Sequence, residues 1–108
     1  MKRLAVVAAL ITSAAACAAP PSGRTCRDAV DTWWPASSRA WMHSIIQRES
    51  RGIATAQNPS SSAAGCTQLL KMHAYRIPGG WGQRYNPDAN ILGALDLYRE
   101  AGTSPWSL

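Results

Sequence analysis

Glu49 is the side chain of this sequence best placed for acid–base chemistry, because the residues before it form an apolar helical face. Ile45 and Trp41 lie four and eight positions before Glu49, so the three side chains are expected on one side of a helix. Desolvation favours the protonated form of a carboxyl group, which is the form that a general acid needs near neutral pH. The pattern therefore predicts a proton-donating Glu49. The alternative is a surface glutamate that pairs with Arg48, Arg51 or a distant basic residue.

Two helices are expected in the first half of the chain, and the second of them carries the glutamate. A short helix is predicted over residues 25–34, where apolar residues recur near helical spacing, and Pro35 is expected to end it. The central helix is predicted over residues 39–51, with Ser37 or Ser38 as its N-cap. This assignment places the glutamate in the last turn of the central helix.

The middle of the chain has a different character. Residues 53–64 are rich in turn formers and show no periodic apolar face. A second short helix is expected to begin near Gly65, with Leu69, Leu70 and Met72 packed inward. The segment between the central helix and this second helix is therefore predicted to be a loop.

The last third of the chain contains one strong helix signal. Residues 77–82 hold one proline and three glycines, which excludes regular structure there. The sequence Asn-Pro-Asp at 86–88 is expected to open the last helix and Gly102 to close it. The apolar face of this helix consists of Ile91, Ala94, Leu95, Tyr98 and Ala101. Pro105 and Trp106 are expected to form a C-terminal clasp, and the fold class is predicted to be mainly α.

The first residues of the chain have the pattern of an export signal. Residues 1–16 combine a basic start, an apolar run over 4–11 and small residues directly before Cys17. This arrangement resembles a bacterial lipobox, in which Cys17 becomes lipidated and anchors the mature protein to the membrane that faces the cell wall. The alternative is ordinary signal cleavage near Ala16 or Ala19, which leaves a secreted protein.

Removal of the signal leaves a short tether over 17–24 and one small domain over 25–108. If Cys17 carries lipid, Cys26 and Cys66 remain as an even pair in an oxidising compartment, where they are expected to form a disulfide. The formal charge falls from +5 for the whole chain to +3 once the signal is removed. This modest positive charge suits an anionic cell wall, but it is too weak and scattered to indicate nucleic-acid binding.

Several short motifs follow one another in a characteristic order. They are Glu49-Ser50, Asn58-Pro59, Ser62-Ala63-Ala64-Gly65-Cys66-Thr67-Gln68, Asn86-Pro87-Asp88-Ala89-Asn90-Ile91, Ala94 and Tyr98. The set resembles the soluble lytic transglycosylase domain of the goose-type lysozyme superfamily, and the similarity covers residues 45–106. The resemblance implies a compact lysozyme-like fold that cleaves peptidoglycan between N-acetylmuramic acid and N-acetylglucosamine. It further implies a monomeric enzyme without a metal or another cofactor.

The resemblance also assigns roles to residues. Glu49 matches the single catalytic acid/base of the family. The positions expected to contact the sugar or brace the acid are Ser50, Asn58, Gly65, Gln68, Asn90 and Tyr98. Trp81 lies in the glycine-rich loop, where it is expected either to stack on a sugar ring or to pack in the core. Cys66 and Thr67 depart from the family, which usually has apolar residues there, and the chain ends before the family's later Ala-Tyr-Asn-x-Gly signature.

The expected reaction uses one carboxyl group. The C6 hydroxyl of the substrate itself attacks, so the product is a 1,6-anhydro sugar and no water is consumed. One alternative is a hydrolytic lysozyme, in which an acid such as Asp28 or Asp96 positions water. Another is a non-catalytic wall-binding or structural lipoprotein of the same fold.

Two other chemistries are less favoured by the sequence. His43 and His73 are the only histidines, and with Glu49 they do not form the His-Glu-x-x-His pattern of a zinc site. A nucleophilic Cys66 lacks a convincing base, so a disulfide explains this residue better.

Overall fold

The computed structural model describes residues 23–107, and the signal segment and Cys17 lie outside the described residues. In this described part of the chain, the α-helices are α3 (Cys26–Trp33), α4 (Arg39–Glu49) and α5 (Pro87–Ala101). The 3-10 helices of the same part are η1 (Ala36–Ser38), η2 (Lys71–Arg76), η3 (Trp81–Gln83) and η4 (Ser104–Trp106). Residues 23–107 contain two isolated β-bridges and no strand, so the prediction of a mainly helical domain is confirmed. None of these helices is both long and apolar enough to cross a membrane.

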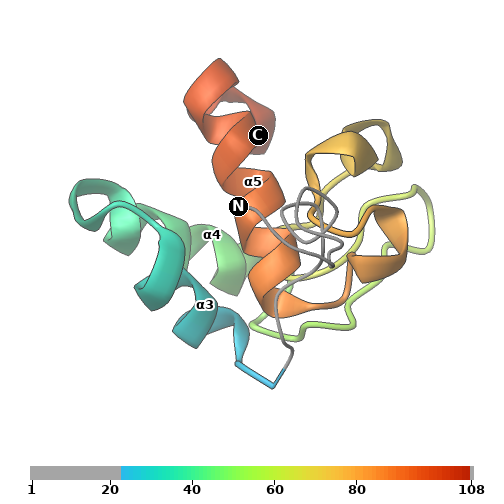
Figure 1. Cartoon of the computed structure of the whole chain (residues 1–108), viewed down its shortest axis with the longest axis horizontal. Coiled ribbons are helices and arrows are strands. Elements are labelled where there is room, and N and C mark those ends of the chain that lie inside the picture. The colour runs from blue at the N-terminus through green and yellow to red at the C-terminus, as the bar shows by residue number, and fades with distance from the viewer. Residues whose placement is uncertain (1–22, 108) are drawn as a thin grey trace, which may run out of the picture.

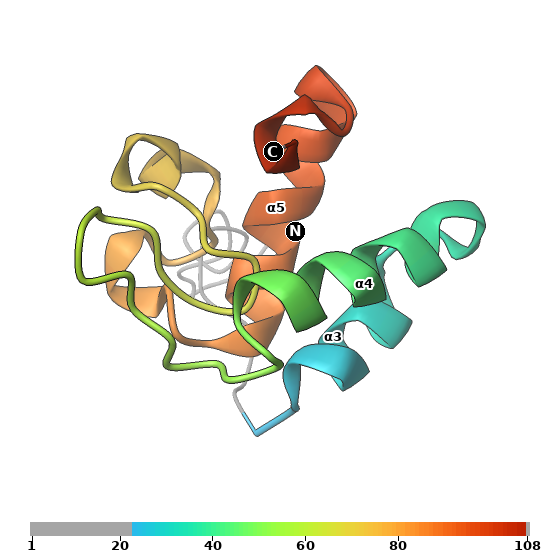
Figure 2. The same ribbon diagram turned by 180° about the vertical axis from the view of Figure 1, so that it is seen from behind.

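Helix α5 is the central element of the domain (Figure 1). Helices α3 and α4 pack against each other on one side of α5, and the loop-rich segment 51–86 lies on the other side, as the reverse view also shows (Figure 2). Contacts join α5 to α3, to η2 and to η4. The last helix therefore connects the helical side of the domain to its loop side.

Local sequence signals set the ends of α3 and α5. The Thr25 hydroxyl accepts the backbone N–H of Asp28 at 3.0 Å and caps α3, which ends before Pro35 as predicted. The Asn86 side chain caps α5 by accepting the backbone N–H of Asp88 at 3.1 Å. Gly102 follows α5 with a φ of 66°, a conformation that glycine adopts without a Cβ clash. Both helices thus begin and end where the sequence placed them.

The predicted second helix near Gly65 is wrong. Residues 64–69 form a tight turn instead, in which the backbones of Ala64 and Leu69 bond to each other at 3.0 and 3.1 Å. Gln68 has a φ of 58°, which a right-handed helix cannot contain. The helical register is therefore lost. Leu69 is buried as predicted, whereas Leu70 and Met72 are 40% and 71% exposed rather than packed inward.

The predicted disulfide is present and joins the start of α3 to the turn. Cys26 and Cys66 are both fully buried and are bonded across a sequence separation of 40 residues. They belong to a core that also receives apolar side chains from α3, α4, α5 and the C-terminal η4. Trp106 of the predicted C-terminal clasp is 6% exposed and part of this core, which confirms the clasp.

Gly65 lies at the closest approach between the turn and α5. Its φ is +82°, and a Cβ atom there would lie 2.2 Å from the Asn90 side-chain nitrogen and 2.3 Å from the Arg84 carbonyl oxygen. A side chain at position 65 therefore meets both an unfavourable backbone conformation and a steric clash. Gly52 has a similar φ of +78°, but a Cβ atom there would have no atom of another part of the chain within 4 Å, which makes it a matched control.

We expect Gly65→Ala to lower the free energy of unfolding by about 2–5 kcal/mol, because the left-handed conformation and the overpacking both add cost. Gly52→Ala has only the conformational cost of about 1–2 kcal/mol. Urea unfolding of the two variants and of the wild type measures the difference. Equal losses in the two variants would contradict the close approach seen at Gly65.

Reduction of the Cys26–Cys66 disulfide is expected to lower the free energy of unfolding by about 4 kcal/mol on the chain-entropy account of a loop of this length. The melting temperature of the purified domain, measured with and without a reducing agent, reports this loss. The Cys26→Ser/Cys66→Ser double variant is the control, since its melting temperature should not respond to the reducing agent. Two free thiols in the untreated protein would contradict the disulfide.

Candidate functional site

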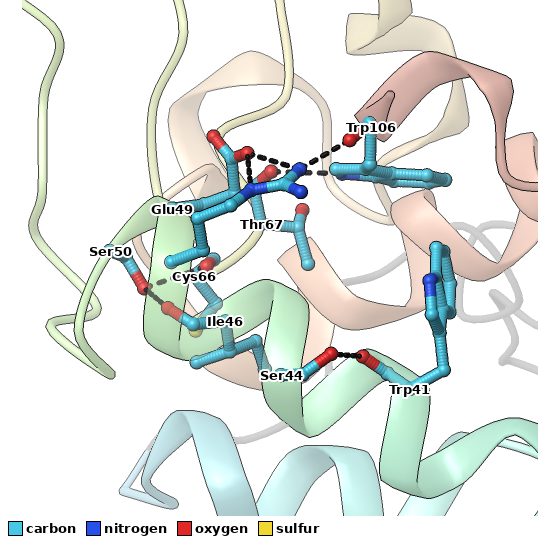
Figure 3. Close-up of polar contacts among 9 residues, drawn as sticks. Trp41, Ser44, Ile46, Glu49, Ser50, Cys66, Thr67 and Trp106 are labelled. Atoms are coloured by element: carbon cyan, nitrogen blue, oxygen red, sulfur yellow. Dashed lines mark hydrogen bonds and ion pairs between the residues drawn. The ribbon is translucent and has the colours of Figure 1, made fainter. Parts of the chain in front are cut away.

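Glu49 is the last residue of α4, and its carboxylate is paired with the neighbouring arginine. The side chain of Glu49 is 26% exposed, and Arg48 donates to its Oε2 from Nε at 3.0 Å and from Nη2 at 2.8 Å. Arg48 Nη2 also donates to the backbone carbonyl of Trp106, so one guanidinium group joins α4 to the C-terminal segment (Figure 3). The other oxygen, Oε1, accepts no hydrogen bond from residues 23–107. Glu49 is therefore not the isolated carboxyl group predicted from periodicity. It pairs with Arg48, as the alternative prediction stated.

The apolar face that precedes Glu49 is present as predicted. Ile45 is 4% exposed, and Trp41 is partly buried against the core. Glu49 continues this face but lies at its end, where the helix stops and the carboxylate reaches the surface. Periodicity therefore placed the residue on the correct side of the helix and overestimated its burial.

Ser50 connects the end of α4 to the 64–69 turn. It is 5% exposed, and its hydroxyl donates to the carbonyl of Cys66 at 2.7 Å, with the carbonyl of Ile46 at 3.2 Å (Figure 3). The same hydroxyl accepts the backbone N–H of Gly52 at 3.2 Å. These bonds hold the residue after Glu49 against the turn. The predicted contact of Ser50 with substrate does not fit a side chain that is buried and bonded in this way.

The side chain of Gln68 forms hydrogen bonds within the 64–69 turn and to the preceding loop. Its side-chain amide donates to the carbonyl of Gly65 at 3.0 Å and to the carbonyl of Ala56 at 3.1 Å. The side chain is partly buried, and its oxygen accepts no hydrogen bond from the described residues. Gly65 and Gln68 therefore define one rigid loop, as the motif predicted, next to the end of α4.

Asn90 fixes this loop to α5. It is fully buried, and its Oδ1 accepts both the backbone N–H and the hydroxyl of Thr67, at 3.0 and 2.7 Å. Its side-chain nitrogen donates to the carbonyls of Ala64 and Arg84, at 3.2 and 3.0 Å. Because Asn90 has no exposed surface, it fits the bracing alternative and not a contact with a glycan. The part of the structure that it braces is the loop beside Glu49.

Tyr98 lies in a cluster of aromatic side chains. Its ring centroid is 5.1 Å from that of Trp34 and 5.4 Å from that of Trp41, and Trp41 in turn meets Trp106 edge-on at 5.8 Å. The indole N–H of Trp106 donates to the carbonyl of Thr67 at 3.1 Å. The aromatic cluster therefore joins α5, α4 and η4 to the loop, and it makes no hydrogen bond to Glu49.

The two remaining predicted sugar contacts lie in loops. Asn58 is exposed, and its side chain accepts the backbone N–H of Ser60 at 2.7 Å in a local turn. Trp81 is partly buried and packs against the core, and the Arg84 guanidinium lies 5.2 Å from the centroid of its ring. One face of the indole is therefore occupied by Arg84, so the arrangement fits the core-packing alternative for Trp81.

The acids considered for water activation make no contact with Glu49. Asp28 is exposed in the first turn of α3. Asp96 is 60% exposed on α5 and pairs with Arg76 at 2.8 Å. Among residues 23–107, no three His, Cys, Asp or Glu side chains form a group that could hold a metal ion. Of Glu49, Asp28 and Asp96, Glu49 is the one next to the Gly65–Gln68 loop, because the adjacent Ser50 bonds to the Cys66 carbonyl.

Two surface depressions lie near these elements, and Glu49 lines neither of them. The larger, about 480 Å³, is open and is lined by residues 74–80 of η2 and the glycine-rich loop. The smaller, about 40 Å³, lies between the loop and the C-terminal segment and is lined by Gln68, Leu69, Leu70, His73, Leu97, Pro105 and Trp106. The larger depression contains none of the predicted site residues. The candidate site is therefore identified by the contacts of Glu49 and Ser50 and not by the size of a cavity.

Comparison with known proteins gives no relative for this chain. No protein-family model, no curated protein and no solved structure matches it.

An ionic cluster fastens η2 to α5. The side chain of Arg76 is 5% exposed and binds Asp96 at 2.8 Å and Glu100 at 2.6 Å, and its Nε donates to His73 Nδ1 at 3.3 Å. The hydrogen bond to Glu100 is the largest cause that raises the pKa of Arg76. Burial, followed by the positive charge of Arg76, lowers the pKa of His73 below 6.5, and Glu100 opposes this in part. Neutral His73 is therefore the form that fits the folded state.

The domain is expected to lose stability as the pH falls below 6.5, because the unfolded chain then takes up a proton on His73 that the folded chain resists. Above pH 6.5 the contribution of His73 is fully present, and it declines as the pH falls toward the lowered pKa of the folded state. Urea unfolding at several pH values measures how the free energy of unfolding changes with pH. Below pH 6.5 this change should be smaller for His73→Gln than for wild type. The same pH dependence in both proteins would contradict the role of His73.

Proposed function

We propose that this chain is a peptidoglycan lytic transglycosylase with a compact lysozyme-like fold, in which Glu49 is the single acid/base. The observation that carries the proposal is the position of Glu49 at the end of α4, directly beside the Gly65–Gln68 loop. Ser50 links the two elements through its 2.7 Å bond to the Cys66 carbonyl. The Glu49 carboxylate is partly exposed, and its Oε1 has no hydrogen-bond partner among residues 23–107. It is therefore accessible to a substrate in a way that a fully buried acid is not.

The proposed reaction uses the carboxyl group twice. Protonated Glu49 donates its proton to the glycosidic oxygen, and the bond from C1 of N-acetylmuramic acid to that oxygen breaks. The C6 hydroxyl of the same sugar bonds to C1 and gives its proton to the Glu49 carboxylate. The products are a 1,6-anhydromuramyl end and a free hydroxyl on the leaving sugar, and the enzyme regains its starting state. The absence of any contact between Glu49 and Asp28 or Asp96 favours this one-acid scheme over hydrolysis with two carboxylates.

The proposed site of action is the cell envelope. Residues 1–16 act as an export signal in this proposal, and a lipid on Cys17 anchors the domain to the membrane through the 17–24 tether. The substrate is the glycan strand of peptidoglycan. The even Cys26–Cys66 pair is consistent with an oxidising compartment.

A second candidate function is a wall-binding lipoprotein without catalytic activity. The Arg48–Glu49 ion pair favours it, because the carboxylate already has a cationic partner in the structure. The position of Glu49 outside both described depressions also fits this candidate. The two functions differ in whether the purified protein releases soluble fragments from cell walls.

Glu49→Gln is the test of the proposed enzyme. We expect the wild type to release soluble anhydromuropeptides from purified cell walls and the variant to release them at least about 100-fold more slowly, because the amide cannot deliver the proton. Liquid chromatography with mass spectrometry measures the fragments. Glu100→Gln is the matched control, since it makes the same chemical change at a side chain that is 69% exposed on α5. Wild-type release of reducing ends would indicate the hydrolase, and no release at all would indicate the wall-binding protein.

A further inference from the structure

We propose that Arg48 is a positioning residue that determines which oxygen of Glu49 carries the catalytic proton. This inference rests on the function proposed above and adds to it the role of a second side chain. The resemblance that suggested Glu49 gives no role to the residue before it. The assignment to Arg48 comes from its contacts with Glu49 and Trp106.

Two nitrogen atoms of the Arg48 guanidinium group donate to the same carboxylate oxygen of Glu49. Arg48 Nε and Nη2 both donate to Oε2 of Glu49, at 3.0 and 2.8 Å. Two donors on a rigid planar group fix the orientation of the carboxylate more firmly than one flexible donor does. Oε1 is left without a hydrogen-bond partner among residues 23–107.

Arg48 is itself fixed by the C-terminal segment. Its Nη2 donates to the carbonyl of Trp106, and the Trp106 indole is anchored by its bond to the Thr67 carbonyl and by the edge of Trp41. The guanidinium group is therefore bonded to both Glu49 and Trp106, although the Arg48 side chain is 37% exposed. The C-terminal clasp formed by η4 therefore contributes to the site, because its Trp106 carbonyl holds the Arg48 guanidinium group that orients Glu49.

The position of Arg48 determines which carboxyl oxygen of Glu49 carries the catalytic proton. Arginine has only hydrogen-bond donors and does not lose its proton in proteins, so a proton on Oε2 would face two N–H groups. The proton is therefore carried on Oε1, and Oε1 is the oxygen that faces the glycosidic bond. When Glu49 gives up the proton, its negative charge develops beside a guanidinium group that is already in place, which is the arrangement that stabilises a transition state electrostatically.

The test compares Arg48→Gln with Arg51→Gln on soluble glycan strands. Arg51 is a matched control because it is an exposed arginine two residues past Glu49 and forms no hydrogen bond or ion pair with residues 23–107. We expect Arg48→Gln to lower kcat about 10- to 100-fold, the effect of a misplaced catalytic group, with KM changed by less than about twofold. Arg51→Gln should leave both constants within about twofold of wild type.

A chemical rescue separates positioning from general structural support. Millimolar guanidinium should restore part of the kcat of Arg48→Ala, where it can occupy the vacated space beside Oε2, and should leave Glu49→Gln inactive. Arg48→Lys provides a second variant that keeps the charge and the aliphatic stem, and an intermediate kcat is expected because lysine supplies no planar fork. Circular dichroism of each variant verifies folding.

Three results would overturn the role of Arg48. A kcat that stays at the wild-type level shows that Glu49 needs no orientation, and a kcat that rises shows that Arg48 restrains the acid. A rise in KM alone shows that Arg48 binds substrate. Failure of the proposed function is distinguishable from all three, because it is seen in an inactive wild type or in a fully active Glu49→Gln.

Discussion

The buried side-chain amide of Asn90 links helix α5 to the 64–69 turn and to the Arg84 carbonyl. One buried amide accepts two bonds from Thr67 and donates to two carbonyls, so it holds the turn against α5. Each unmade bond of this kind in a buried place costs about 1–3 kcal/mol. The Ala64 carbonyl also accepts the backbone N–H of Leu69, whereas the Thr67 hydroxyl and the Thr67 N–H bond to Asn90. Gly65 permits the approach, because any larger residue would meet the Asn90 side chain.

From this anchored turn, two short paths lead to Glu49. Ser50 joins the turn to the end of α4 through the Cys66 carbonyl, and the disulfide joins the same cysteine to α3. The Thr67 carbonyl holds the indole of Trp106, whose own carbonyl receives Arg48 (Figure 3). The carboxylate is therefore placed by a continuous set of contacts that begins inside the domain. A single acid at the end of a helix requires such support, since no second carboxylate of the described chain holds it in place.

Much of the helical structure was predictable, because its signals are local. Thr25 and Asn86 cap their helices through bonds within three residues, and Gly102 ends α5 by its own conformation. The exposure of Met72 was not predictable, because it depends on the left-handed backbone at Gln68, which the apolar spacing does not reveal. The Arg48–Trp106 contact spans 58 positions of sequence and uses a backbone carbonyl, so no residue type signals it. Local patterns thus determined the helices, whereas the surroundings of Glu49 depended on contacts between distant segments.

The origin of the oxygen atom at the released glycan end distinguishes the proposed reaction from hydrolysis. Wild-type protein can be incubated with purified cell walls in water enriched in oxygen-18, and the released glycan ends can be analysed by mass spectrometry. We expect 1,6-anhydromuramyl ends without oxygen-18, because the C6 hydroxyl of the sugar is the nucleophile. Reducing ends that carry oxygen-18 would contradict this expectation, because a water molecule would then have attacked the sugar.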